Sequence, residues 1–259
     1  MQTSSRSLGQ RSELRNKYNS SSVRCMRRFL RFLLRSIAFT TLVKIEHVEG
    51  LENVPAEGPA ILMMNHIAFV DPIVLVYVVP RDVIPMAKIE VYDYPVVGIF
   101  PRLWGVVPVR REEFDRRAIQ EALQVLAAGE VLLVAPEGTR GPALQRGKEG
   151  IAYLASRSGA PVVPVAISGT TGYPAFRLSS RWKGSGANVR LGKPFRFKFE
   201  YNRAKQDQLR LMTDEAMYTI AAMLPPELRG VYSDLSQASD GTIEWLSGTT
   251  VKGTGLTEL

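Results

Sequence analysis

The chain has 259 residues, 45% of them hydrophobic and 22% charged, and these ordinary globular proportions exclude a disordered, collagenous or low-complexity protein. Cys25 is the only cysteine, which excludes an internal disulfide framework and favours a reducing compartment. His47 and His66 are the only histidines, so we expect no catalytic metal.

The net charge of +8 is concentrated at the start of the chain. Residues 1–50 hold ten Lys or Arg against three Asp or Glu, a net +7, whereas the rest of the chain is almost neutral. The basicity is therefore a property of the N-terminal segment. It does not indicate a nucleic-acid-binding fold, and we expect no nucleic acid partner.

The N-terminal segment divides into two parts. Residues 1–22 are polar and rich in Ser and Arg, which predicts a disordered arm. Residues 23–43 predict a basic amphipathic helix, with one arginine face and an apolar face mostly opposite (Arg24, Arg28, Arg31 and Arg35; Phe29, Leu30, Leu33, Leu34 and Ile37). Such a helix can lie in a membrane interface, or it can pack on its own domain as a surface helix. No stretch is a continuous apolar span of the length that crosses a bilayer.

From residue 44 onward, short apolar runs alternate with helical patterns. Asp71 and Pro72 resemble an N-cap and a first-turn proline that open a helix through Val79. We expect strands at 60–64, 82–87, 104–109, 131–135, 161–167 and within 187–199, and further helices at 113–128, 147–159 and 203–223. This order predicts an α/β fold, in which a mostly parallel central sheet is flanked by helices. The domain is expected to span residues 44–230, and the Ser-, Gly- and Thr-rich residues 231–259 predict a flexible tail.

The segment Asn65-His66-Ile-Ala-Phe-Val-Asp71 joins a buried strand to a helix, the place where active sites collect in α/β sheets. Asp71 is close enough along the chain to reach an imidazole nitrogen of His66. A carboxylate on Nδ1 would fix the tautomer and leave Nε2 to accept a proton. The alternative is that Asp71 only caps the helix and that His66 is a buried histidine without catalytic work.

Two further groups of charged residues follow strands. Arg110 and Arg111 come after the strand at 104–109, and two arginines at a strand end can hold a phosphate. The turn Glu137-Gly138-Thr139-Arg140 follows the strand at 131–135, with Arg146 and Lys148 a few residues on. Taken singly, each group is better explained as solvated surface charge.

Together these segments resemble the motifs of the PlsC-type glycerolipid acyltransferases, the 1-acylglycerol-3-phosphate acyltransferases. The family's N-H-x-x-x-x-D motif matches Asn65-His66 to Asp71, and its E-G-T-R motif matches Glu137 to Arg140. A glycine followed five residues later by arginine matches Gly105 to Arg110, and a V-P-V-like strand matches residues 163–165. The resemblance covers about residues 45–230. One departure is Val109, because many relatives carry aspartate just before the arginine.

The resemblance implies a reaction and a set of roles. A fatty acyl group moves from acyl-CoA or acyl-carrier protein, as co-substrate, to the free hydroxyl of 1-acylglycerol-3-phosphate, with no cofactor. The product is phosphatidic acid. His66 is implied as the base and Asp71 as the residue that orients it. Substrate contact is implied for Asn65, Gly105, Arg110, Glu137, Gly138, Thr139 and Arg140, with Arg146 and Lys148 as further candidates for the phosphate or the thioester carrier.

Other interpretations stay open. The acceptor could be a different lysolipid or lipid, since Val109 alters the motif associated with acceptor contact. Water could replace the acceptor, which would make the protein a thioesterase, or the chain could be a membrane-binding protein without catalysis. Membrane lipids as partners, together with the basic helix, imply a peripheral protein on the cytoplasmic face of a membrane, and the short length is typical of bacterial members.

Overall fold

The computed structural model describes residues 21–34, 36, 43–95, 98–110, 115–198 and 206–246. Within them, nine strands form one sheet, and seven of these follow the order β1-β7-β6-β2-β5-β3-β4. The strands are β1 (Ile45–Glu49), β2 (Ala60–Met64), β3 (Val83–Lys88), β4 (Val107–Val109), β5 (Val131–Val134), β6 (Val162–Ser168), β7 (Ala187–Leu191), β8 (Phe195–Phe197) and β9 (Ile243–Trp245).

The sheet is mostly parallel, which confirms the predicted fold class. β2 pairs in parallel with both β5 and β6, and β3 pairs in parallel with β5 and β4. The antiparallel pairs, β6 with β7 and β8 and β8 with β9, lie toward the other end. Every residue of β2 and β5 is buried, as expected for central strands covered on both faces.

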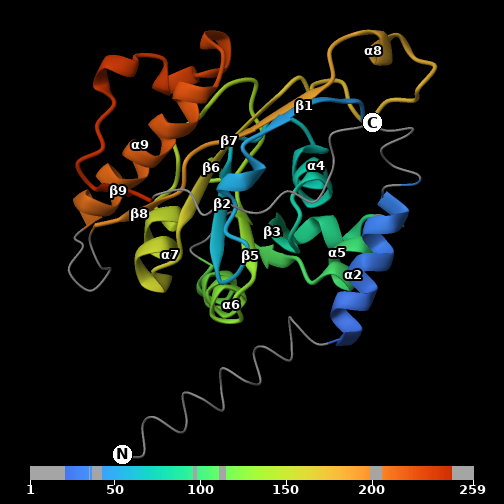
Figure 1. Ribbon diagram of the computed structural model, residues 1–259, viewed down its shortest axis with the longest axis horizontal. Coiled ribbons are helices and arrows are strands. Elements are labelled where there is room, and N and C mark those ends of the chain that lie inside the picture. Colours follow the sequence, from blue (N-terminus) through green and yellow to red (C-terminus); the bar gives the residue numbers. More distant parts are fainter. Residues whose placement is uncertain are drawn as a thin grey trace, which may run out of the picture.

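Helices cover both faces of the sheet. They are α2 (Ser21–Leu33), α4 (Asp71–Val78), α5 (Ile99–Trp104), α6 (Arg116–Ala127), α7 (Gly150–Ser158), α8 (Ser180–Lys183) and α9 (Gln206–Met223). Figure 1 shows α7 and α9 to one side of the sheet, and α4, α5 and α2 to the other. None of the helices in the described part of the chain is long and apolar enough to span a bilayer.

Most element predictions agree with the structure within a few residues, but the segment before β4 differs. Residues 104–106 were expected in a strand, whereas Trp104 ends helix α5 and the strand begins at Val107. The buried Trp104 indole donates a hydrogen bond to the Val83 carbonyl, 2.7 Å away. This tertiary contact outweighs the local strand preference of the run.

The expected flexible tail also differs, because part of it belongs to the fold. Ile243–Trp245 pairs with β8 as strand β9. The carboxylate of Glu215 on α9 accepts hydrogen bonds from the backbone of Gly241 and Thr242 and from the hydroxyl of Ser239. The tail prediction is therefore wrong for the part of residues 231–246 held in this way, and residues 247–259 lie outside the described residues.

Helix α2 packs on the domain through the buried Leu30 and through an arginine. Arg27 is fully buried, its Nε donates to the Trp104 carbonyl at 3.0 Å, and its guanidinium lies 3.7 Å from Asp82 and 4.0 Å from Glu130. Arg31, expected on the solvent or membrane side, instead donates to Asp82 Oδ1 at 3.0 Å. Burial raises the pKa of Glu130, and the nearby Arg27 opposes that shift.

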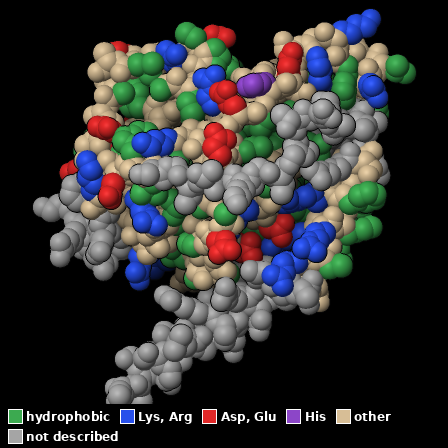
Figure 2. All heavy atoms as spheres, in the orientation of Figure 1, with side chains coloured by type: hydrophobic (Ala, Val, Ile, Leu, Met, Phe, Trp, Pro, Cys, Tyr) green, Lys and Arg blue, Asp and Glu red, His purple; other side chains and the backbone are tan. Residues whose placement is uncertain are grey.

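This packing leaves an apolar face on the outside. Met26, Phe29 and Phe32 of α2 are exposed, and Ile99 and Leu103 are exposed on α5, which packs against α2. We call these five residues the α2–α5 patch. Figure 2 shows hydrophobic and basic side chains together along this flank. Most of the predicted disordered arm (residues 1–20) and residues 37–42 of the predicted helix lie outside the described residues.

Candidate active site

The site begins where β2 ends. The side chain of the buried Asn65 spans two backbone groups of Ile167 on the neighbouring strand β6: its Nδ2 donates to the carbonyl at 2.9 Å, and its Oδ1 accepts from the N–H at 2.8 Å. Both functional atoms are thereby used inside the protein. The predicted substrate contact of Asn65 does not fit this geometry, and we assign Asn65 to positioning the next residue, His66.

His66 and Asp71 form the expected pair. His66 Nδ1 lies 3.0 Å from Asp71 Oδ2, and the Asp71 side chain is fully buried. The same oxygen accepts hydrogen bonds from the backbone N–H groups of Ile67 at 2.7 Å and Ala68 at 2.8 Å. Asp71 was expected as the N-cap of the helix, but it is the first residue of α4, and its carboxylate turns back to hold the loop. This arrangement fixes the imidazole and leaves Nε2 for a substrate proton.

Glu137 fixes the other side of the histidine. Its buried carboxylate accepts the backbone N–H of His66 at 3.0 Å through Oε1 and that of Gln145 at 2.8 Å through Oε2. Burial raises the pKa of Glu137 to about 7, although these two hydrogen bonds oppose the shift. With both oxygens engaged by backbone, Glu137 is a positioning residue instead of the predicted substrate contact.

The turn after Glu137 brings a lysine to the site. Gly138 has φ +70°, and a Cβ built there would lie 3.1 Å from the Lys148 Nζ, so the lysine lies directly over the glycine. The Lys148 N–H donates to the Pro136 carbonyl at 2.9 Å, and the Gly141 N–H donates to the His66 carbonyl at 3.0 Å. These bonds join the loop that carries Lys148 to the loop that carries His66.

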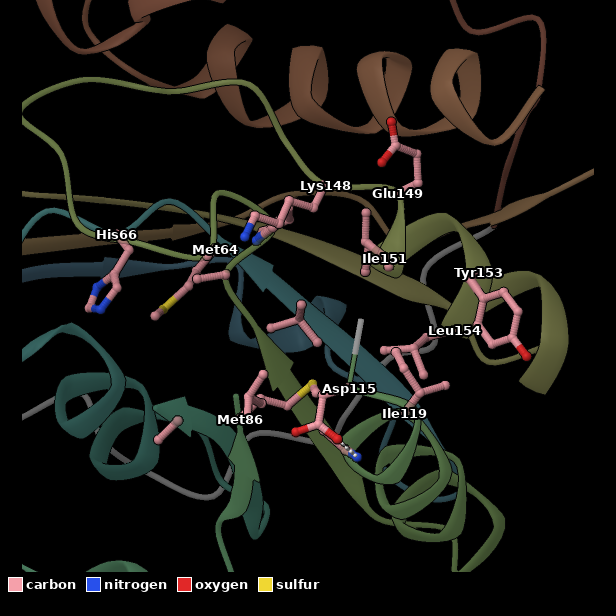
Figure 3. A pocket seen from close by; sticks show the side chains of 18 of the residues that line it. Met64, His66, Met86, Asp115, Ile119, Lys148, Glu149, Ile151, Tyr153 and Leu154 are labelled. Carbon is pink, nitrogen blue, oxygen red and sulfur yellow. Dashed lines mark hydrogen bonds between the residues drawn. The ribbon is translucent and has the colours of Figure 1, made fainter. Parts of the chain in front are cut away.

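His66 opens into a cavity of about 500 Å³ between the sheet, α6 and α7. Arg110, Gly138 and Lys148 line it with His66, and most other lining side chains are apolar (among them Met64, Met86, Ile119, Val134, Ile151 and Leu154). Figure 3 shows His66 and Lys148 at one end, and Ile119, Leu154 and Tyr153 toward the other. The cavity therefore combines the polar groups of His66 and Lys148 with a mostly apolar lining, which suits an extended hydrocarbon chain with a polar end.

The remaining predicted residues fall into two groups. Thr139, Arg140 and Arg146 are exposed in the loop between β5 and α7, and they are outside the cavity lining. Gly105 precedes β4 whereas Arg110 follows it, so the two lie at opposite ends of the strand. Gly105 ends α5 with φ +82°, and a Cβ built there would lie 3.4 Å from the Arg27 guanidinium. Its predicted substrate contact is therefore replaced by a role in the helix turn.

Sequence reasoning did not single out the apolar lining or Asp115. Asp115 lines the cavity beside Arg110, and its carboxylate accepts from the backbone N–H groups of Arg110 at 2.9 Å and Ala118 at 3.0 Å. Both hydrogen bonds lower the pKa of Asp115, and the bond from the Arg110 N–H has the larger effect. The expected helix began at residue 113, which would put Asp115 inside it, and no local pattern indicates that this side chain faces a cavity.

The fold is an α/β sandwich with a histidine–carboxylate pair at the carboxyl edge of its sheet, an arrangement that can activate a nucleophile. A family model described as Acyltransferase matches residues 46–168. The 1-acyl-sn-glycerol-3-phosphate acyltransferase of Borreliella burgdorferi is 32% identical over 49% of this chain and 52% of that protein. The protein of the same name from Bacillus subtilis is 32% identical over 47% of this chain and 62% of that protein.

A solved structure is also similar. The 1-acyl-sn-glycerophosphate acyltransferase PlsC from Thermotoga maritima aligns with a TM-score of 0.52 and 25% identity, covering 74% of this chain and 75% of that one. The alignments span about half the length of the curated relatives named above. Residues 46–168 are thus similar to acyltransferases, and the chain resembles the PlsC-type glycerolipid acyltransferases in sequence and in fold.

Proposed function

We propose that this protein transfers a fatty acyl group from an acyl thioester to the free hydroxyl of 1-acylglycerol-3-phosphate, giving phosphatidic acid. The observation that carries the proposal is the His66–Asp71 pair at the mouth of an apolar cavity that Arg110 and Lys148 also line. Acyl-CoA or acyl-carrier protein is the co-substrate, and the reaction uses no cofactor.

In the proposed reaction, His66 Nε2 takes the proton of the acceptor hydroxyl while Asp71 stabilises the imidazolium that forms. The alkoxide oxygen attacks the thioester carbonyl, and a tetrahedral intermediate results. Its collapse breaks the C–S bond, and the leaving thiolate takes the proton back from His66. Cys25, the only cysteine, is exposed on α2 and does not line the cavity, which supports direct transfer over an acyl-enzyme.

The assay that tests the proposal supplies the purified protein with lysophosphatidic acid and palmitoyl-CoA, and follows CoA release and lipid products together. Phosphatidic acid formed at the rate of CoA release supports the transferase. CoA release at the full rate without any acceptor identifies a thioesterase instead. Val109 and Asp115 line the cavity together with Arg110, the cation that we assign to the acceptor phosphate. Because these neighbours could alter the choice of acceptor, a panel of other lysolipids is the second assay.

Arg110 is expected to hold the acceptor phosphate. Arg110→Ala should raise the KM for lysophosphatidic acid by about tenfold to a hundredfold, with a smaller change in kcat, because a charge-assisted hydrogen bond to phosphate is lost. Steady-state kinetics at saturating thioester measures this. Arg157→Ala, at an exposed position at the end of α7, is the matched control. An unchanged KM would place the phosphate elsewhere.

The cavity is expected to hold the acyl chain of the thioester, with Ile119 at the end away from His66 (Figure 3). Ile119→Trp should shift the preferred acyl-CoA to shorter chains by about tenfold in relative kcat/KM, since the larger ring occupies space that the terminal methylenes need. Ile119→Leu conserves volume and should leave the preference unchanged. A parallel loss across all chain lengths would contradict the assignment.

We further propose that the protein is peripheral on the cytoplasmic face of a bacterial membrane and that the α2–α5 patch contacts the lipid. Phe29→Ser with Phe32→Ser should lower co-sedimentation with anionic vesicles by about tenfold, because two exposed rings no longer enter the interface. Point variants are preferable to removal of residues 1–40, because that truncation would also remove the buried Arg27 and its contacts with the domain. Leu211→Ser, at an exposed position on α9, is the control.

A further inference from the structure

A second exposed apolar group lies in the loop that joins β6 to β7, residues 169–186, which includes α8. The exposed fractions are 77% for Phe176 and 99% for Leu178. Arg177 lies between them in sequence and is exposed, as is Lys183. Figure 1 shows the loop projecting from the sheet, and Figure 2 shows hydrophobic and basic side chains gathered at its outer end.

The loop is internally braced. The Arg181 guanidinium donates to the carbonyls of Thr171 at 2.7 Å and Ser185 at 2.6 Å, and it lies over the Tyr173 ring, 4.4 Å from the centroid. The Trp182 indole donates to the Ala175 carbonyl at 2.7 Å and meets the Tyr173 ring edge-on. These contacts give the loop a defined structure. Phe176 and Leu178 are therefore exposed on an ordered loop.

The position of the loop relates it to the active site and to α2. β6 and β2 are parallel, so the loop leaves the same edge of the sheet at which His66 follows β2. At the loop's base, Lys44 accepts from the Ala187 N–H at 2.7 Å and donates from Nζ to the Gly184 carbonyl at 3.1 Å. Figure 1 shows the loop and α2 on the same flank of the molecule.

We propose that Phe176 and Leu178 insert into an anionic bilayer as a second membrane contact, with Arg177 and Lys183 at the lipid headgroups. This inference rests on the proposed function, because it is useful only to an enzyme whose acceptor lies in a membrane. Two apolar side chains with flanking cations suit a membrane interface. They form too small a surface for a stable protein–protein interface. Two contacts, at α2 and at the loop, would fix the orientation of the sheet edge that carries His66.

The test uses the full chain with Cys25→Ser, so that one introduced cysteine carries an environment-sensitive fluorophore. Three proteins are labelled in this way: Leu178→Cys in the loop, Phe32→Cys on α2, and Val231→Cys as the control. Val231 is 66% exposed and lies in the C-terminal segment, away from the proposed contacts. Vesicles of phosphatidylglycerol and phosphatidylcholine should shift the emission to the blue at positions 178 and 32 and leave position 231 unchanged. The unlabelled double variant Phe176→Ser with Leu178→Ser should bind vesicles about tenfold more weakly. It should keep its activity toward a short-chain acceptor that is monomeric in solution.

Three other results would contradict the proposed loop contact, and each has a different meaning. A shift at position 32 alone overturns the loop contact and leaves the proposed function standing. A shift at neither position overturns both membrane contacts, while acyl transfer is judged separately from the monomeric acceptor. If the double variant binds vesicles normally but loses activity only with acyl-carrier protein as donor, the loop binds the carrier and the membrane inference is wrong.

Discussion

Replacing His66 by alanine is expected to lower the rate of phosphatidic acid formation by about a hundredfold or more, since the variant has no base for the acceptor hydroxyl. The fold should survive. Asp71 still accepts the N–H groups of Ile67 and Ala68, and the β2–β6 contact through Asn65 does not involve the imidazole. The measurement is initial rate with lysophosphatidic acid and palmitoyl-CoA, beside circular dichroism of both proteins.

The chain offers a matched control, because it has one other histidine. His47 is exposed on β1, where its ring lies 3.2 Å from Glu49, and it does not line the cavity. His47→Ala should keep the full rate. Equal losses in the two variants would show that a general effect of histidine removal was measured. A His66→Ala protein with normal turnover would exclude base catalysis by this residue.

Glu137→Gln is expected to change both the rate and the pH dependence of stability. Both carboxylate oxygens accept backbone N–H groups, and an amide offers only one acceptor. Its NH₂ group would face the N–H of His66 or of Gln145. The resulting shift of the loop should lower kcat by roughly tenfold, with little change in the KM for acceptor, because a positioning error of this kind affects mainly the chemical step.

The pH dependence follows from the pKa of Glu137, which burial raises from 4.5 to about 7. The folded protein then binds this proton more tightly than the unfolded chain does. The contribution of this proton to the free energy of unfolding is fully present below pH 4.5 and is lost as the pH rises through about 7. The loss is about 3 kcal/mol by the usual conversion of pKa differences. Glutamine cannot ionise, so Glu137→Gln lacks this loss.

Urea unfolding at a series of pH values measures the effect. The free energy of unfolding of the natural protein, minus that of Glu137→Gln, should fall between pH 4.5 and pH 8. Glu227→Gln, at an exposed position, should follow the natural protein at every pH. Parallel curves for the natural protein and Glu137→Gln would show that Glu137 ionises normally in the folded state.

The elements that the sequence predicts well have strong local patterns. The apolar run at 60–64 coincides with β2, and the amphipathic helix expected at 113–128 is α6 from Arg116, with residues 111–114 outside the described part. The strand order was not predicted, because β2 pairs with β5 and β6, each far away in the chain. Pairing of this kind depends on the packing of the whole domain and leaves no signal in a single segment.

The α/β class could be predicted from the alternation of strand and helix patterns. Spacing alone left the roles of His66, Asp71 and the cations after the strands open, and the resemblance to a known family selected them as site residues. The three-dimensional structure was needed to show which of these residues line the cavity. The side chains of Asn65 and Glu137 bind backbone groups, Gly105 ends α5 at the opposite end of β4 from Arg110, and Arg27 is buried between α2 and the rest of the domain. The physical reason is that the roles of polar side chains depend on partners distant in sequence. The packing of the whole domain determines which groups become neighbours, and a short sequence motif contains no information about that packing.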